Sequence, residues 1–195
     1  MSSVETRLKQ AAVALVLRRN MDETELLVIK RAEDPRDHWS GHLALPGGRR
    51  DPEDPDLSFT AVRETFEEVG MKLSEGGRIV RQLETITPRS PLAPQIAVTP
   101  YVAIAPPAYH VTTDGSERMR LRLSAEVEAA FWVPLSSLRS RGASEIFRLA
   151  VEGDEAREWP AYATDYGLIW GLTERILTGF LELMDEDENL LFDRS

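Results

Sequence analysis

The sequence contains no cysteine in 195 residues. This absence excludes disulfides, thiolate metal sites and cysteine nucleophiles, and it is compatible with a reducing compartment. Any metal ion must therefore be bound by oxygen or imidazole ligands.

Long apolar runs are also missing. No run approaches the roughly 20 residues that a membrane-spanning helix needs, and residues 1–10 lack the apolar centre of a secretion signal. We therefore expect a cytoplasmic protein that does not use a membrane.

Basic residues are scarce relative to acidic ones. Lys and Arg total 23 against 33 Asp and Glu, which gives a formal net charge of -10. Such a balance disfavours a surface for polymeric nucleic acid, whose binding depends on many phosphate contacts. A small anionic substrate stays compatible with this charge, because divalent cations held by clustered carboxylates can invert the local field.

The chain is long enough for one domain with a substantial core. It shows no internal repeat, low-complexity tract or linker. We therefore predict a single domain over residues 1–195, with an acidic C-terminal tail at about 185–195.

Apolar runs rich in strand-forming residues predict two antiparallel strands, Ala11–Arg18 and Glu25–Arg31, joined by a polar hairpin loop. Four prolines, at positions 88, 91, 94 and 100, predict an irregular segment. The other predicted strands are Leu43–Leu45, Gln82–Thr87, Val98–Ala105 and Glu128–Val133.

Helical spacing marks three segments. In Ser58–Met71, apolar residues recur at i, i+4 and i+7 (Val62, Phe66 and Val69) and predict an amphipathic helix with these residues towards the core. Asp56 or Ser58 can cap its start and Gly70 its end. A short helix is expected after Pro134, with Ser136 as its cap, and a C-terminal helix over Tyr166–Met184. This mixture predicts an α/β protein with a sheet between helices.

Three glutamates, Glu64, Glu67 and Glu68, stand at i, i+3 and i+4 on the helix predicted from Ser58 to Met71. Their carboxylates would share one patch about one turn long and would repel one another without a cation. Hard divalent ions such as Mg²⁺ or Mn²⁺ prefer such oxygen ligands. The alternative is a solvated acidic face, which is common in acidic proteins.

The residues around these glutamates resemble the Nudix box, which reads Gly, five residues, Glu, seven residues, Arg-Glu-U-x-Glu-Glu-x-Gly-U, where U is bulky and apolar. Gly48, Arg63–Glu64 and Glu67–Met71 match it. Asp54 stands at the first acidic position, eight residues precede Arg63 instead of seven, and Thr65 occupies the first U position. A one-residue loop insertion accounts for the altered spacing.

The resemblance implies a Nudix α/β/α sandwich, with a mixed sheet between the box helix and the C-terminal helix. It implies Mg²⁺ or Mn²⁺ as cofactor, bound chiefly by Glu67 and Glu68, with the backbone carbonyl of Gly48 as an additional ligand. Glu64 would be a further ligand or the catalytic base that activates water. Arg63 would orient the carboxylates by ion pairing; the alternative is an exposed surface arginine.

Two further segments resemble the branch of Nudix hydrolases that cleaves coenzyme A. Leu26–Ala32 leads through Arg36 and Gly41 to Leu45–Gly48, although Val28 replaces a threonine, Leu45 replaces a phenylalanine and one extra residue precedes Gly41. Ile169–Leu177 resembles the C-terminal Trp-Gly-x-Thr-x-Arg-Ile-Leu helix of that branch. The implied reaction converts coenzyme A or acyl-CoA to 3′,5′-ADP and 4′-phosphopantetheine.

Arg31 and Arg36 are the candidates for substrate binding, since guanidinium groups bind phosphate through two N–H bonds; salt bridges are their alternative role. Trp39 and Tyr101 either stack on adenine or belong to the core. Glu126 or Glu128 either completes the metal site or forms a structural ion pair.

Two other functions stay open. One is hydrolysis of a different nucleoside diphosphate derivative, such as ADP-ribose or a dinucleoside polyphosphate. The other is a catalytically silent Nudix domain that senses a nucleotide, against which the three retained glutamates argue. A homodimer is an open alternative for the assembly.

Overall fold

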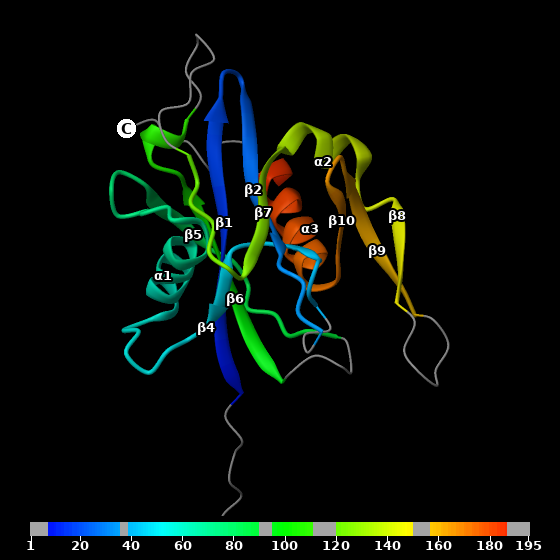
Figure 1. The fold of residues 1–195 in the computed structure, drawn as a ribbon. Helices are drawn as coiled ribbons and strands as arrows, with labels where there is room; N and C mark the ends of the chain where they lie inside the picture. The colour runs from blue at the N-terminus through cyan, green and yellow to red at the C-terminus, as the bar shows by residue number, and fades with distance from the viewer. Residues whose placement is uncertain (1–7, 36–38, 90–94, 111–119, 150–156, 187–195) are drawn as a thin grey trace, which may run out of the picture.

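The computed structural model describes residues 8–35, 39–89, 95–110, 120–149 and 157–186. Two sheets and three α-helices make up this part of the chain (Figure 1). In chain order the elements are β1 (Lys9–Asn20), β2 (Glu23–Arg31), β3 (Leu43–Ala44), β4 (Gly47–Arg49), α1 (Leu57–Val69), β5 (Arg78–Gln82), β6 (Ile96–Ile104), the 3-10 turn η1 (Pro107–Tyr109), β7 (Val127–Pro134), α2 (Leu135–Arg141), β8 (Glu145–Leu149), β9 (Arg157–Thr164), β10 (Gly167–Trp170) and α3 (Gly171–Glu186).

The larger sheet is mixed and has seven strands. Its central order is β3-β2-β1-β6-β5, while β4 pairs with β1 and β7 pairs with β2. The pairing of β1 with β6 is parallel and the other pairings are antiparallel. The predicted β1–β2 hairpin is confirmed, and its strands extend through most of the polar stretch that was expected to form the loop.

Both faces of this sheet are covered, with α1 on one side and α3 on the other (Figure 1). Side chains along β1 alternate between the two faces of the sheet, because successive side chains of a strand point in opposite directions. This alternation explains why the strand contributes to two cores. Leu15 and Leu17 belong to the core that contains α3, whereas Ala14 and Val16 belong to the core under α1. The predicted sheet between the two helices is thus confirmed.

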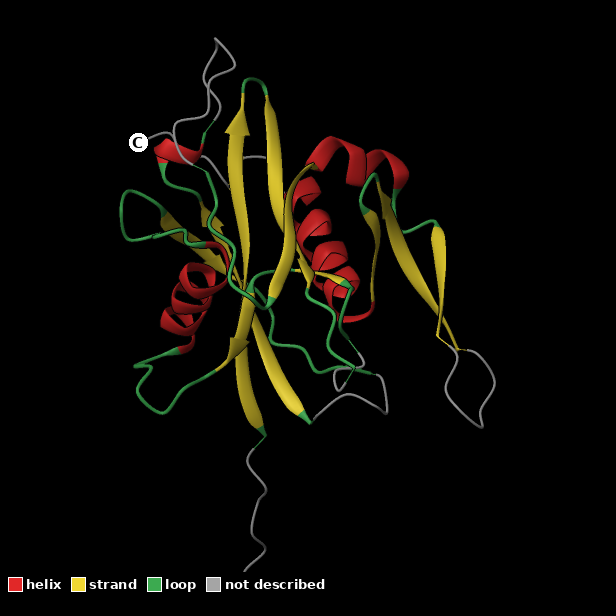
Figure 2. Ribbon diagram, in the orientation of Figure 1, coloured by secondary structure: helices red, strands yellow, loops and turns green. Residues whose placement is uncertain are grey.

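A second, three-stranded antiparallel sheet in the order β10-β9-β8 was not predicted from the sequence. It lies beyond α3, so that α3 is enclosed between the two sheets (Figure 2). Tyr162 of β9 and Ile169 of β10 share a core with Leu177 and Phe180 of α3. This sheet therefore completes the burial of the C-terminal helix.

The C-terminal helix begins later than predicted. Tyr166–Met184 was expected to be helical, but Gly167–Trp170 forms β10 and the helix starts at Gly171. The periodicity of a short apolar run cannot distinguish a buried strand from a helix. Gly171 has φ +68° and separates the two elements, a conformation that glycine adopts without strain.

Two strand predictions also need correction. The strand expected at Gln82–Thr87 lies earlier, at Arg78–Gln82, and Ile86 forms only an isolated bridge with Val98. The strand expected at Val98–Ala105 is confirmed as β6, and Pro100, which was also counted in the irregular segment, lies in this strand opposite Val13. Proline lacks an N–H donor, but the Pro100 carbonyl accepts a hydrogen bond from Leu83 (2.9 Å).

The short helix after Pro134 is confirmed as α2, but its predicted cap is wrong. Pro134 itself stands at the N-cap and no side chain caps the helix. The hydroxyl of Ser136 instead donates to Glu23 (2.6 Å).

No helix in the described residues has the length and apolar character needed to cross a membrane.

Candidate active site

The helix α1 that carries the three glutamates has well-defined ends. At its N-cap, Asp56 accepts a hydrogen bond from the N–H of Phe59 (2.8 Å), and Gly70 ends the helix in the left-handed conformation with φ 70°. The N–H of Gly70 donates to the carbonyl of Phe66 (2.9 Å). Both ends agree with the sequence, with Asp56 and not Ser58 as the cap.

The buried face of α1 matches only in part the one that its apolar spacing predicted. Val69 is fully buried and Val62 packs against the same core, as expected. Phe66 is 46% exposed, whereas Ala61 and Thr65 are fully buried and Glu68 is only 5% exposed. The small side chains of Ala61 and of Ala14 in β1 share one core, and small residues allow a helix to approach a sheet closely. The helix therefore turns Glu68 towards the protein.

Glu68 is held against the start of β4. Its Oε2 accepts a hydrogen bond from the N–H of Gly47 (2.9 Å). Burial raises the pKa of Glu68 to about 7, an effect that the nearby charges of Glu64 and Glu126 increase and that the Gly47 N–H and Arg31 oppose. A carboxylate in this position is costly to ionise unless a cation lies beside it.

Gly47 of the Pro-Gly-Gly turn is required sterically, and Gly48 lies directly against the end of the flexible Glu64 side chain. Gly47 has φ +153°, and a β-carbon there would collide with the backbone of β1 at Ala12 and Val13. A β-carbon on Gly48 would collide with the carboxylate of Glu64. The absence of both side chains lets the turn lie directly against β1 and the glutamates of α1.

Arg63 is clamped to this turn through Asp54. Its Nε and Nη2 donate to Asp54 Oδ1 (3.1 Å) and Oδ2 (3.0 Å), and Nη2 also donates to the carbonyl of Arg49 (3.0 Å). Thr60 donates a further bond to Asp54 (2.8 Å). The bond from Arg63, with help from Thr60, lowers the pKa of the buried Asp54 to about 2. Asp54 therefore takes the acidic position despite the altered spacing.

Arg63 also joins two of the glutamates. Its Nη1 lies 3.0 Å from Glu64 Oε1 and 3.0 Å from Glu67 Oε2, and the arginine side chain is only 17% exposed. The alternative of an exposed surface arginine is excluded by these contacts. Arg63 instead connects the clamp at Asp54 with the carboxylates on the next turn of α1.

The acidic side chains do not form a ready-made cation cage. Within the described ranges, no group of three acidic or histidine side chains is arranged to hold a metal ion, because Glu64 and Glu67 point to Arg63 and Glu68 points to Gly47. The chemistry nevertheless suits Mg²⁺ or Mn²⁺. Burial raises the pKa of both Glu64 and Glu68, and a divalent cation would stabilise the charged form of this pair.

The two candidates for an additional acidic ligand have different surroundings. Glu128 forms an ion pair with Lys30 (2.7 Å). The charge of Glu126, in contrast, contributes to the raised pKa of Glu68. Glu126 is therefore the better placed of the two.

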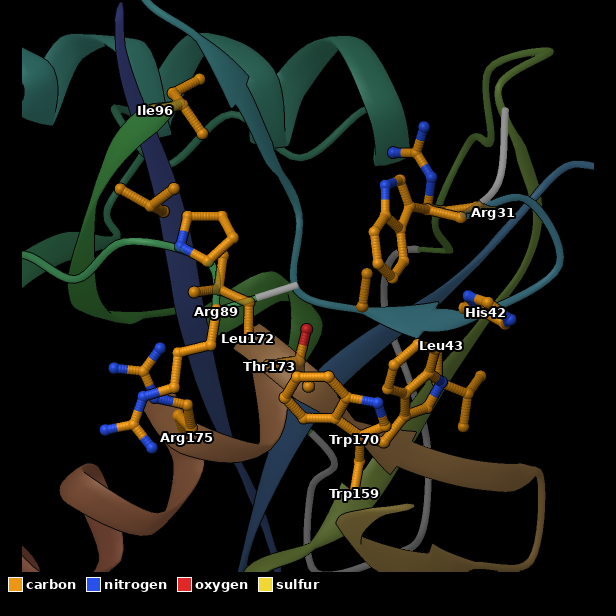
Figure 3. Close-up of a pocket in the computed structure, with 15 residues that line it drawn as sticks. Arg31, His42, Leu43, Arg89, Ile96, Trp159, Trp170, Leu172, Thr173 and Arg175 are labelled. Carbon is orange, nitrogen blue, oxygen red and sulfur yellow. The ribbon is translucent and has the colours of Figure 1, made fainter. Parts of the chain in front are cut away.

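A cavity of about 250 Å³ opens beside the start of α3. Two of the residues that the sequence proposed for substrate contact line it, Trp39 and Arg31. Arg31 is labelled in Figure 3. Tyr101 lies elsewhere, buried in the core under α1, and donates to Gln82 (3.3 Å). Arg36 lies outside the described residues.

Sequence reasoning missed three further residues that line this cavity, Arg89, Trp159 and Arg175. Arg175 belongs to the C-terminal segment that resembles the coenzyme A branch, so a signal for it was present. Arg89 and Trp159 carried none, because they come from a loop and from the unpredicted second sheet.

Comparison with known proteins places this geometry in a family. Residues 8–151 match the NUDIX domain. The chain belongs to the Nudix family. It is 32% identical over 169 residues to an uncharacterized Nudix hydrolase NudL from Enterobacter sp., covering 87% of this chain and 79% of the relative. A NudL from Cronobacter sakazakii is 33% identical over 180 residues, covering 91% and 83%.

Solved structures show the same fold. A Caenorhabditis elegans Ap4A hydrolase in a binary complex superimposes with a TM-score of 0.51 at 21% identity, covering 68% of this chain and 85% of that one. A MutT/nudix protein from Enterococcus faecalis gives 0.57 at 16% identity, covering 95% and 65%. These structures show the fold, and the family match with the NudL relatives makes the chain a Nudix hydrolase. The α1 segment with its preceding turn carries the residues that resemble the Nudix box. Nudix hydrolases generally use divalent ions such as Mg²⁺ or Mn²⁺.

Proposed function

We propose that this Nudix hydrolase cleaves the diphosphate of coenzyme A or acyl-CoA, giving 3′,5′-ADP and 4′-phosphopantetheine, with Mg²⁺ or Mn²⁺ as cofactor. The observation that carries the hydrolytic part is the buried carboxylate of Glu68, whose pKa burial raises to about 7. Folding holds this carboxylate beside Glu64 at the Gly47–Gly48 turn. Such a costly placement is explained by a cation that binds there.

Four groups would hold the metal. They are the carboxylates of Glu64, Glu67 and Glu68 and the backbone carbonyl of Gly48, all of which are hard oxygen donors. Bound Mg²⁺ or Mn²⁺ supplies charge that neutralises the diphosphate oxygens and acidifies water. Occupation of the site would compete with Arg63 for Glu64 and Glu67, which are now 3.0 Å from its Nη1.

Glu64 is the proposed catalytic base. Burial raises its pKa, which brings a carboxylate closer to the proton affinity that general-base catalysis requires. It would accept a proton as the water oxygen attacks phosphorus and the bond between phosphorus and the departing phosphate oxygen breaks. Arg63 is a positioning residue, because its bonds to Asp54 and Arg49 fix the guanidinium that contacts Glu64.

The coenzyme A assignment rests on the two branch-like segments of the sequence. Residues from both line one cavity: Arg31 comes from the first segment, and Trp170 and Arg175 come from the second. The similarity to an Ap4A hydrolase, at 21% identity, shows the fold alone. Diadenosine polyphosphates and ADP-ribose are therefore the competing substrates to test.

A substrate panel with product mass analysis tests the proposal. We expect coenzyme A to be cleaved with a kcat/KM at least about tenfold above those for ADP-ribose, Ap4A and dNTPs. Glu68→Gln should lower turnover about 100-fold or more at saturating Mn²⁺, whereas Glu145→Gln, which changes an exposed side chain in β8, should not. Preference for ADP-ribose or Ap4A would refute the substrate assignment, and unchanged turnover of Glu68→Gln would refute the ligand assignment.

A further inference from the structure

The cavity beside α3 is bounded by parts of the chain that are distant in sequence. Its aromatic residues come from the segment before β3 (Trp39), from β9 (Trp159) and from β10 (Trp170). Its volume of about 250 Å³ lies below the roughly 300–1,000 Å³ of pockets that hold whole drug-sized ligands. The cavity therefore suits one end of a large substrate.

The aromatic walls are suited to a planar, polar ring. Trp170 is supported from behind by Phe147, which stacks on it at 4.0 Å and 15°, and Trp39 meets Trp170 at 5.6 Å and 43°. The indole N–H of Trp159 is buried and has no acceptor among the described residues. The stacked aromatic faces of this wall suit a planar ring such as a purine.

Two arginines of like charge lie at the end of the cavity remote from Arg31 (Figure 3). Arg175 is fixed by a bond from its Nη1 to the carbonyl of Thr87 (2.8 Å). Burial, and then the charge of Arg89, lower the pKa of Arg175, so the two guanidinium groups are near neighbours. In the described part of the chain, no ion pair joins either of them to an acidic side chain.

One carboxylate, Glu174, lies near both arginines. It is buried in α3 and accepts a hydrogen bond from Thr178 (2.8 Å). Glu84 and Glu182 lie with Arg175 on a neighbouring surface, but no acidic side chain is among the described residues that line the cavity itself. This end of the cavity therefore keeps a positive charge that suits an anion.

Arg31 connects the other end of the cavity with the Nudix box. It lines the cavity, and its charge lies close enough to Glu68 to oppose the rise in the pKa of that residue. In Figure 3 its guanidinium points towards α1. The order in space is therefore the carboxylates, Arg31, the tryptophans, and then Arg89 with Arg175.

We propose that this cavity binds the adenosine of the substrate and that Arg89 and Arg175 bind a phosphate monoester carried by its ribose. The proposal rests on the function proposed above and names the group that gives it specificity. Coenzyme A has such a phosphate, and dephospho-CoA does not. The alternative occupant is the pantetheine and acyl end of the substrate, which would fit the apolar walls. The pantetheine group carries no anion for the two arginines, and for this reason the adenosine is preferred.

Kinetics with the two nucleotides test the role of the arginines. We expect wild-type kcat/KM to be about 10- to 100-fold higher for coenzyme A than for dephospho-CoA, as charge-assisted bonds to phosphate give. Arg89→Gln should reduce this ratio about tenfold, mainly through the KM for coenzyme A. Arg89 is exposed, so its loss should not disturb folding. Arg81→Gln, a change of another exposed arginine in β5, should leave the ratio unchanged.

Direct binding separates this proposal from the proposed function. Calorimetry should show 3′,5′-ADP binding at least about tenfold more tightly than 5′-AMP, which lacks only the 3′-phosphate, and Arg175→Gln should remove most of that difference. Trp39→Leu should weaken both nucleotides through loss of stacking. If 3′,5′-ADP binds in this way but coenzyme A is not cleaved, the proposed function fails and the subsite stands.

Two results would overturn the subsite. Equal kcat/KM for coenzyme A and dephospho-CoA in the wild type, with cleavage of both, would leave the function intact and remove the phosphate site. A Trp39→Leu variant that alters the dependence of KM on acyl-chain length, with unchanged affinity for 3′,5′-ADP, would assign the cavity to the acyl end.

Discussion

Replacing Glu68 by glutamine should stabilise the metal-free protein while removing its activity. The carboxylate of Glu68 is 5% exposed, and burial raises its pKa from the ordinary 4.5 to about 7. In the unfolded chain this group loses its proton near pH 4.5, whereas in the folded chain it keeps the proton until about pH 7. Folding stability therefore falls as the pH rises through this window.

The size of the effect follows from the same values. The rise in the pKa from 4.5 to about 7 corresponds, at about 1.36 kcal/mol for each pH unit, to about 3 kcal/mol of lost stability above pH 7. Glutamine has nearly the same shape, and its Oε1 can still accept the hydrogen bond from the Gly47 N–H. It carries no charge to desolvate, so this loss should be absent.

Urea unfolding in EDTA at pH 5 and pH 8 measures the difference. Glu68→Gln should differ little from the wild type at pH 5 and should exceed it by about 3 kcal/mol at pH 8. Glu67→Gln removes the same charge from the neighbouring position, but its side chain is 54% exposed, so it should change stability by less than about 1 kcal/mol at either pH. A wild-type advantage over Glu68→Gln at pH 8 would refute the reasoning.

Three further predictions concern the turn and the orientation of α1. Asp54→Asn should lower kcat, because the hold on Arg63 is weakened. The pKa of Asp54 is lowered to about 2, so its charge stabilises the wild-type fold above pH 4, and this stability should be lost as the pH falls from 4 to 2. Acid titrations followed by circular dichroism should show this loss in the wild type and not in Asp54→Asn. Gly48→Ala should reduce turnover more than about tenfold in a folded protein, because the added methyl meets the Glu64 carboxylate; normal activity would contradict the close approach. In urea unfolding, Phe66→Ala should lower the free energy of unfolding by less than about 1 kcal/mol, whereas Ala61→Leu should lower it by about 1–3 kcal/mol. The reverse order would contradict the buried face described for α1.

The ends of α1 could be predicted because caps are local. Asp56 and Gly70 act through bonds within a few residues, and the helical period between them follows from the backbone alone. The exposure of Phe66 and the burial of Thr65 and Glu68 could not be predicted in the same way, although Val69 is buried as expected. The orientation of the helix decides them. It depends on the surface that the helix meets, and β1 offers alanines at positions 12 and 14, which accommodate Ala61 and Thr65 better than Phe66.

The cavity beside α3 could be predicted from the sequence even less well than the buried face of α1. Trp39, Arg89, Trp159 and Arg175 come from four separate segments, and only the tertiary fold brings them together. The sequence contained a signal for the Trp170–Arg175 segment but none for a second sheet, since β10 was read as the first turn of a helix. Non-local pairing of this kind leaves little trace in local periodicity.

The box also shows why an altered spacing need not change the chemistry. Asp54 has a shorter side chain than the glutamate of the family pattern and stands one residue further from Arg63, yet it binds both Nε and Nη2 of that arginine. Thr60 and the N–H of Asp51 hold the carboxylate in place (2.8 and 3.0 Å), so the loop absorbs the extra residue. What the site requires is a buried anion that fixes Arg63, because Arg63 in turn restrains Glu64. The spacing of the pattern is one way to meet this requirement, and the clamp built from Asp54 and Thr60 is another.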